Sequence, residues 1–239
     1  MYTDVVDLRD FYESSLGQVA TRMLRRRIRE IWPSLEGASL AGIGFAAPLL
    51  RPYLGEAARI VSLMPAPQGV LHWPKDGPNL ATLTEEAELP FQDSSIDRLM
   101  LVHALECADQ VQVLLDEVWR VLAGGGRVLF VVPNRRGIWA RLDRTPFGTG
   151  NPYTQGQLSR LLRDAAFTPV RVHGALYVPP TGWRMLLSAA GAWETVGDRW
   201  FSTFAGVLVV EATKQIYGRV KAKPARSRRL AYRPAGASV

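Results

Sequence analysis

The sequence predicts an α/β fold built on a doubly wound, mostly parallel sheet. Short apolar segments alternate with amphipathic helical segments, and strands that are apolar on both faces are typical of parallel sheets covered on two sides. The chain has 239 residues, of which 47% are hydrophobic. This length allows one sizeable core and is short for two full domains, so we expect one domain with additions.

The alternation begins after an N-terminal helical segment. Residues 17–31, GQVATRMLRRRIREI, place apolar side chains at helical spacings, with the arginines largely on the other face. Proline suits a first helical turn and glycine a helix end, so Pro48 is expected to open a helix and the glycines at 124–126 to end another. The expected strands are 38–43, 59–64, 96–102 and 127–132, and the expected helices are 48–54 and 111–122.

The last third of the chain changes character. We expect a helix at 155–166, strands at 168–173 and 206–211, and a mostly helical insertion at 181–200 that carries Trp183, Trp193 and Trp200. Two strands joined by a long excursion fit an antiparallel hairpin at the sheet edge. The tryptophans are interpreted as core or interface packing rather than substrate contacts.

The positive charge is concentrated at the C-terminal end. The formal net charge is +7, and residues 219–239 carry all of this excess and no acid. We therefore expect one domain over 1–218, with a helical lead-in at 1–36, and a basic disordered tail at 219–239. The tail is interpreted as solubilising, with RNA or anionic lipid as the alternative contact. Bases stack on spaced aromatic side chains, and the tail has only one aromatic residue, Tyr232, which argues against nucleic acid as a partner.

Several classes of site are disfavoured by composition. The single cysteine, Cys107, excludes an internal disulfide, and His72, His103 and His173 are too scattered to predict a metal site. The first residues, MYTDVVDLRDFYE, are acidic and polar where a signal peptide is basic and then apolar, and no apolar run reaches membrane-spanning length. We expect a cytoplasmic protein.

A glycine-rich turn follows the first expected strand. LAGIGFAAPLLRP, residues 40–52, places Gly42 and Gly44 where a nucleotide-like cofactor commonly meets a sheet. The pattern also fits the dinucleotide fingerprint, but that fingerprint expects a carboxylate about 20 residues further on, and the second strand ends at Met64. Ligands of such sheets bind beyond the carboxyl ends of the strands. The candidate loops are 42–46, 64–66, 103–105 and 133–137.

The segment from Glu85 to Asn134 resembles the class I S-adenosylmethionine-dependent methyltransferases, in the branch that acts mostly on small molecules. The similarity lies in LPF at 89–91, SID at 95–97, HALE at 103–106 and RVL at 120–122, in the family's order and spacing. Weaker matches at 40–46 and 161–167 extend it to about 37–211. The resemblance implies a seven-stranded sheet, with a reversed seventh strand beside the fifth, and S-adenosylmethionine as cofactor.

The resemblance also implies a cofactor site and two departures from it. Leu40 and Met64 stand where the family usually has acids, the second of which grips both ribose hydroxyls. A charged hydrogen bond contributes about 1.5 to 3 kcal/mol, so we expect weakened or rerouted cofactor binding. The implied cofactor-binding residues are Gly42, Ile43, Gly44, Phe45, Met64, Glu85, Glu86, Ala87 and His103, with the glutamates and Ala87 facing the adenine.

Methyl transfer is an in-line displacement, so a base is needed only when the nucleophile must lose a proton. The catalytic candidates are His103, Asn134, Arg136 and Tyr153, with Arg135 and Thr154 beside them. The arginine pair could clamp a carboxylate or phosphate or be an ordinary surface pair, and His103 could make a structural hydrogen bond instead. Cys107 is interpreted as a helix-packing residue.

Two functions from different classes remain after these steps. The first is a methyltransferase with a small-molecule or protein acceptor. The alternative is a catalytically degenerate methyltransferase-like protein that acts as a binding or regulatory partner, with residues 181–200 as the partner surface. A third possible function, RNA methylation, is supported only by the basic tail.

Overall fold

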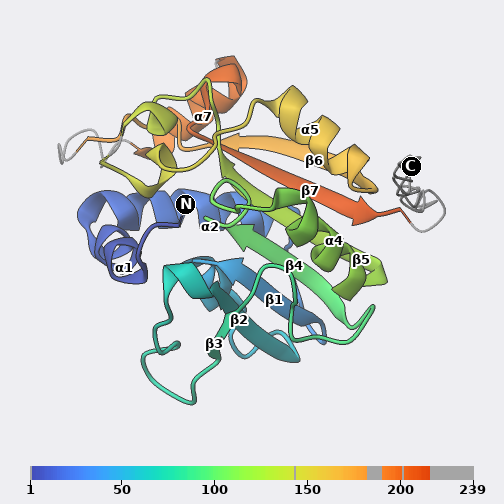
Figure 1. Ribbon diagram of the computed structural model, residues 1–239. Coiled ribbons are helices and arrows are strands. Elements are labelled where there is room, and N and C mark those ends of the chain that lie inside the picture. Colours follow the sequence, from blue (N-terminus) through green and yellow to red (C-terminus); the bar gives the residue numbers. More distant parts are fainter. Residues whose placement is uncertain (1, 143, 182–189, 201, 216–239) are drawn as a thin grey trace, which may run out of the picture.

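The computed structural model describes residues 2–142, 144–181, 190–200 and 202–215, and its centre is a seven-stranded sheet in the order β3-β2-β1-β4-β5-β7-β6 (Figure 1). β3, β2, β1, β4 and β5 are parallel, and β7 is antiparallel to both of its neighbours. The predicted sheet and its antiparallel edge are confirmed. The strands are β1 Ser39–Gly44, β2 Arg59–Pro65, β3 Ala81–Thr84, β4 Ile96–Val102, β5 Leu122–Pro133, β6 Phe167–Ala175 and β7 Val207–Lys214.

Helices cover both faces of this sheet. One core holds Leu40, Met100 and Leu129 of the strands and packs under α1 Val5–Glu13, α2 Ser15–Ile31 and α3 Ala47–Leu50. The opposite core lies under α4 Val111–Val121 and α5 Gln155–Asp164 (Figure 1). The remaining helices are α7 Ala190–Trp200 and the short 3-10 helices η1 Arg51–Tyr53, η2 Ala66–Gln68, η3 Trp139–Arg141, η4 Pro146–Gly148 and η5 Ser202–Phe204.

The structure corrects three sequence-based expectations. The glycines at 124–126 lie inside β5, which begins directly after α4, so they do not form a loop between the two. β3 was not predicted, because it has four residues, two of them exposed, and no apolar run. The helix expected from Pro48 is a single turn that continues into η1.

Two further expectations lie beyond the reach of the structure. Residues 219–239 and Trp183 are outside the described residues, and the boundaries proposed for the domain stay predictions. Within the described part of the chain, no helix is long and apolar enough to cross a lipid bilayer.

The connection from β2 to β3 has no long helix. Parallel strands are usually joined by a crossover helix. Here η2 and the loop 69–80 make the connection, and the loop folds back toward α1, where Lys75 pairs with Glu13 at 2.6 Å. The position usually covered by a helix is therefore lined by loop residues, among them His72 and Trp73.

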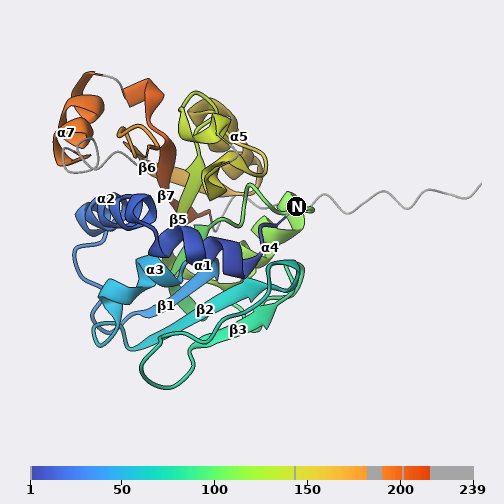
Figure 2. The same cartoon turned by 90° about the vertical axis from the view of Figure 1, so that its left-hand side faces the viewer.

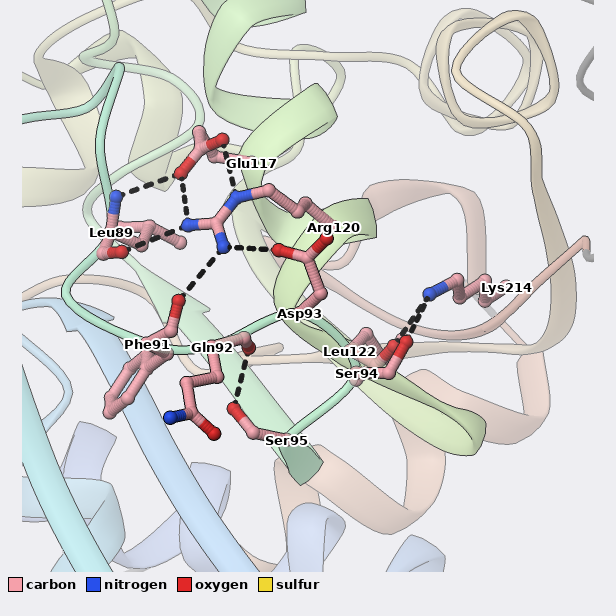
Figure 3. A network of polar contacts seen from close by, with 10 residues as sticks. All are labelled: Leu89, Phe91, Gln92, Asp93, Ser94, Ser95, Glu117, Arg120, Leu122 and Lys214. Atoms are coloured by element: carbon pink, nitrogen blue, oxygen red, sulfur yellow. Dashed lines mark hydrogen bonds and ion pairs between the residues drawn. The ribbon is translucent and has the colours of Figure 1, made fainter.

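Arg120 of α4 holds the loop that precedes β4 (Figure 3). Its guanidinium donates to both carboxylate oxygens of Glu117, at 2.8 and 2.7 Å, and to Asp93 at 2.8 Å. It also donates to the carbonyl oxygens of Leu89 at 3.0 Å and Phe91 at 2.8 Å. The family-like LPF and RVL segments are thus joined to each other by hydrogen bonds within the scaffold.

Candidate functional site

The carboxyl ends of β1 and β4 meet at the glycine turn. Gly44 has a φ of 81°, and a Cβ on it would lie 2.1 Å from the carbonyl oxygen of Val102. The backbone nitrogen of Phe45 donates to that same oxygen at 2.8 Å. Close packing of the turn on β4 therefore accounts for Gly44 by itself, because only glycine avoids the clash in this backbone conformation.

The N-terminal segment lies across this edge of the sheet, with α1 in front of the ends of β1 and β2 in Figure 2. The ring of Tyr12 stacks on Phe45, with centroids 5.4 Å apart, and its hydroxyl is 2.8 Å from Nε2 of His103. The hydroxyl of Tyr2 donates to the carboxylate of Glu86. Three predicted cofactor-binding residues, from three different loops, are thus covered by residues 2–12.

His103 and Glu106 form a buried pair beneath α1. His103 has a φ of 52°, a conformation that costs free energy for a residue with a side chain. Its Nδ1 lies 3.3 Å from Oε1 of Glu106, and among the described residues neither oxygen of this buried carboxylate has a hydrogen-bond partner. The carboxylate favours the tautomer with the proton on Nδ1, so Nε2 accepts from Tyr12.

The charge of Glu106 affects three phenols. Burial, and after it the charge of Glu106, raises the pKa of Tyr12 and of Tyr153. For Tyr2 the causes of the raised pKa are burial first, then the hydrogen bond and charge of Glu86, with a smaller contribution from Glu106. This edge of the sheet therefore combines a histidine base, a carboxylate that orients it and phenols that stay protonated.

S-adenosylmethionine fits these residues only in part. Among the described residues, the buried carboxylate of Glu106 and Nδ1 of His103 have no hydrogen-bond partner, and Glu86, which accepts from Tyr2, presents a carboxylate where the adenine is expected. Leu40 is buried in the apolar core, and Met64, also buried, offers no ribose acceptor. Ile43 belongs to the core on the opposite face, while Glu85 and Ala87 are exposed.

The predicted substrate-side residues separate into two groups. Nδ2 of Asn134 donates to the carbonyl oxygens of Ala205 at 2.7 Å and Thr203 at 3.0 Å, so this amide joins the end of β5 to the segment before β7. Arg136 is exposed, whereas Tyr153 is half-buried and senses the charge of Glu106. Of the four catalytic candidates, the structure brings His103 and Tyr153 to the same carboxylate.

Cys107 lies in the turn after β4 and not in a helix, in contrast to its interpretation as a helix-packing residue. Burial, and next the charge of Glu106, raises the pKa of its thiol to about 12. The thiol therefore stays protonated at neutral pH and is a poor nucleophile.

A cavity of about 930 Å³ opens beside Tyr12. It lies between α1, α2, the start of α3 and the loop 69–80, and both Phe45 and Met64 reach it. The contributions of Tyr2, Tyr12 and Glu106 to this region were not predicted. Nothing in the sequence near Tyr12 indicates a partner 91 residues away.

Replacing Tyr12 with alanine is expected to expose His103. In the unchanged protein His103 is buried under the Tyr12 ring, while His72 is exposed and serves as an internal reference. Modification of His103 by diethyl pyrocarbonate, followed by peptide mass spectrometry, should become faster by more than about tenfold in Tyr12→Ala, because the covering ring is lost. Tyr12→Phe keeps the ring and should keep His103 protected. Equal modification of His103 and His72 in the unchanged protein would contradict the covering role of α1.

Comparisons with known proteins agree with this architecture. A family model described as a methyltransferase domain matches residues 41–130. No curated protein matches the chain in sequence. The match confirms the resemblance predicted from the sequence, and S-adenosylmethionine is the cofactor of that family.

Solved structures share the fold at low sequence identity. In a complex of the Haloferax volcanii Trm112 methyltransferase activator with a methyltransferase, the similar chain has a TM-score of 0.65 at 16% identity, over 90% of this chain and 100% of that one. A Thermotoga maritima S-adenosylmethionine-dependent methyltransferase gives 0.62 at 15%, over 88% and 96%. A Burkholderia thailandensis 1,6-didemethyltoxoflavin-N1-methyltransferase, with 1,6-didemethyltoxoflavin and S-adenosylhomocysteine bound, gives 0.53 at 15%, over 88% and 85%.

Proposed function

We propose that this chain, which carries a methyltransferase domain of the class I S-adenosylmethionine-dependent type, transfers a methyl group to a small-molecule or protein acceptor. One observation carries the proposal. Phe45, Glu86 and His103, predicted from three separate motifs, come together under the same N-terminal segment. Residues that serve only the core would not need to converge at the carboxyl edge of a parallel sheet, which is where ligands of such folds bind.

The bound cofactor would supply a methyl group on a sulfonium. Glu86 and Ala87 would face its adenine, and the turn from Gly42 to Phe45 would lie against its methionine portion. Met64 would contact the ribose without a hydrogen bond. These contacts require the N-terminal segment to move away, because Tyr12 now covers Phe45 and His103 and Tyr2 donates to Glu86.

Ser14 is the junction at which such a movement would occur. It ends α1 and begins α2, and its backbone is extended, with a φ of −66° and a ψ of 160°. A change of backbone angles at this residue would turn α1 relative to α2, at the cost of the bridge that the Ser14 hydroxyl makes by donating to the carbonyl oxygen of Phe11 at 2.6 Å and accepting from the backbone nitrogen of Gly17 at 3.1 Å. α2 can then stay packed on the sheet while α1 admits the ligands.

His103 would act as the base when the acceptor carries a proton. With Tyr12 displaced, Nε2 of His103 faces the opened cleft, and Glu106 stabilises the imidazolium that forms when Nε2 takes the proton. Glu106 is a positioning residue in this scheme. Placement of the acceptor supplies the rest of the acceleration.

Calorimetry with S-adenosylmethionine and S-adenosylhomocysteine tests the proposal directly. We expect measurable heat with both compounds and a rise in melting temperature with the second, since a ligand that binds only the folded state stabilises it. Absence of heat and of a thermal shift at millimolar ligand would overturn the cofactor-dependent function.

A second candidate, a methyltransferase-like binding partner without catalysis, is favoured by the surface around α7. Trp193, Trp200 and Phe204 are 41%, 71% and 61% exposed there, although large aromatic side chains are usually buried or in contact with a partner. Recovery of a stoichiometric protein from the native host, together with no cofactor binding, would support this candidate. Turnover by the monomer would argue against it.

A further inference from the structure

The lining of the cavity beside Tyr12 carries more positive than negative charge. Its lining includes Arg9, Arg22, Arg25, Arg51 and Lys75, and the carboxylate among its lining residues is that of Glu13. Lys75 pairs with Glu13, and Arg9 pairs with Asp10 at 2.8 Å. The three remaining arginines have no carboxylate partner among the described residues.

Two of these arginines, Arg25 and Arg51, lie close enough to affect each other. Arg25 donates to the carbonyl oxygen of Pro48 at 2.9 and 2.6 Å, while Arg22 and Arg51 make no polar contact with the described residues. Burial, and next the charge of Arg51, lowers the pKa of Arg25. A group of like charges is unfavourable unless an anion compensates it.

The rest of the cavity is apolar. Phe45, Met64 and Trp73 form part of its lining, and each of them is buried against the core. Small-molecule sites typically have volumes of about 300 to 1,000 Å³ and combine an apolar lining with a few charged groups that fix orientation. This cavity, at about 930 Å³, has the size and both components.

We propose that this cavity binds a small organic anion, with a carboxylate, phosphate or sulfonate held by Arg22, Arg25 and Arg51 and an apolar body against Leu71 and Trp73, which leaves Phe45 and Met64 to the cofactor. This inference rests on the proposed function and specifies it, because the anion is the methyl acceptor. The ring of Tyr12 separates the cavity from His103, so displacement of α1 joins the acceptor site to the base.

The cofactor is a poorer match for the same charges. S-adenosylmethionine carries a sulfonium and an ammonium against one carboxylate, so a cavity with uncompensated arginines repels it overall. An anionic acceptor is attracted to these arginines and would be placed next to a positively charged sulfonium. The electrostatics thus distinguish the two ligands that a methyltransferase must bind.

The binding test uses 8-anilino-1-naphthalenesulfonate, an apolar fluorescent anion, with the full chain and no cofactor. The double variant Arg22→Ala/Arg51→Ala should bind the dye at least about tenfold more weakly, because two charged contacts are lost. Arg26→Ala is the matched control. Arg26 lies on the same helix and pairs with Glu30 at 3.4 Å outside the cavity, so its loss should leave dye binding unchanged.

A competition series separates charge from apolar burial. Phenylbutyrate should displace the dye, the uncharged phenylbutanamide should be at least about tenfold less effective, and added salt should weaken the acid only. Equal dye binding by the double variant and Arg26→Ala, or equal competition by acid and amide, would overturn the anion site. Because no cofactor is present, these outcomes are independent of the calorimetric test of methyl transfer.

Discussion

Replacing Met64 with glutamate is expected to strengthen the binding of S-adenosylhomocysteine by about ten- to a hundredfold. Met64 lines the cavity, and the resemblance to the methyltransferases implies at this position a carboxylate that binds both ribose hydroxyls. A hydrogen bond to a charged group contributes about 1.5 to 3 kcal/mol, and every 1.4 kcal/mol is a tenfold change in affinity. Calorimetric titration of the variant and the unchanged protein measures the difference.

The same substitution carries a stability cost that makes the test specific. Met64 is 1% exposed, so the new carboxylate is buried without a partner until a ribose reaches it. We expect a lower melting temperature for the free variant and a larger ligand-induced rise than in the unchanged protein. Met64→Leu retains the apolar volume and should change neither quantity much. A folded glutamate variant with unchanged affinity would show that the ribose does not reach this position.

The fold could be predicted because its signals are local. β4 and β5 are apolar on both faces, and α4 shows its apolar stripe in a single stretch of 11 residues. The short β3 escaped prediction because register with β2, rather than its own composition, makes it a strand. The glycines at 124–126 indicated a helix end but are held extended in β5, where they precede the stretch that pairs with β4 and β7.

The candidate site could be predicted only where a motif already contains the residue. His103 and Glu86 were identified through their neighbours in sequence, yet the groups that contact them, Tyr12 and Tyr2, come from the N-terminal segment more than 80 residues away. The basic cavity could not be predicted for the same reason, because residues distant in the sequence line it. Arg22 is exposed, as a solvated helix face predicts, and only the fold shows that it also lines a cavity together with residues of α1, α3 and the loop 69–80.

Several motif residues make hydrogen bonds that stabilise the fold and are independent of catalysis. Asp97 of the SID segment accepts from the backbone nitrogen of Ser39 at 2.9 Å and from its hydroxyl at 2.8 Å, which joins β4 to β1. Arg120 of the RVL segment holds LPF (Figure 3). A sequence match through these residues is therefore evidence for the scaffold, and the evidence for chemistry must come from the turn residues and from His103.

Arg120→Ala is accordingly expected to destabilise the protein by about 2 to 4 kcal/mol without touching the glycine turn or His103. The substitution removes five hydrogen bonds and leaves the half-buried carboxylate of Glu117 without its cation. That carboxylate has a lowered pKa, with the hydrogen bond from Arg120 as its largest cause. A carboxylate with a lowered pKa stabilises the folded protein at pH values above its pKa in the unfolded chain, and this stabilisation is lost as the pH falls. Arg120→Ala removes the cause of the lowered pKa, so the variant should lose less stability than the unchanged protein on acidification.

Denaturant unfolding at neutral and acidic pH measures both effects. Arg120→Lys should recover only a part of the loss, since one ammonium cannot reach Glu117, Asp93 and two carbonyl oxygens at once. Arg163→Ala, an exposed arginine of α5, is the matched control and should stay within about 0.5 kcal/mol of the unchanged protein. If Arg120→Ala unfolds like this control, the network in Figure 3 does not hold the loop, and the RVL segment must be retained for another reason.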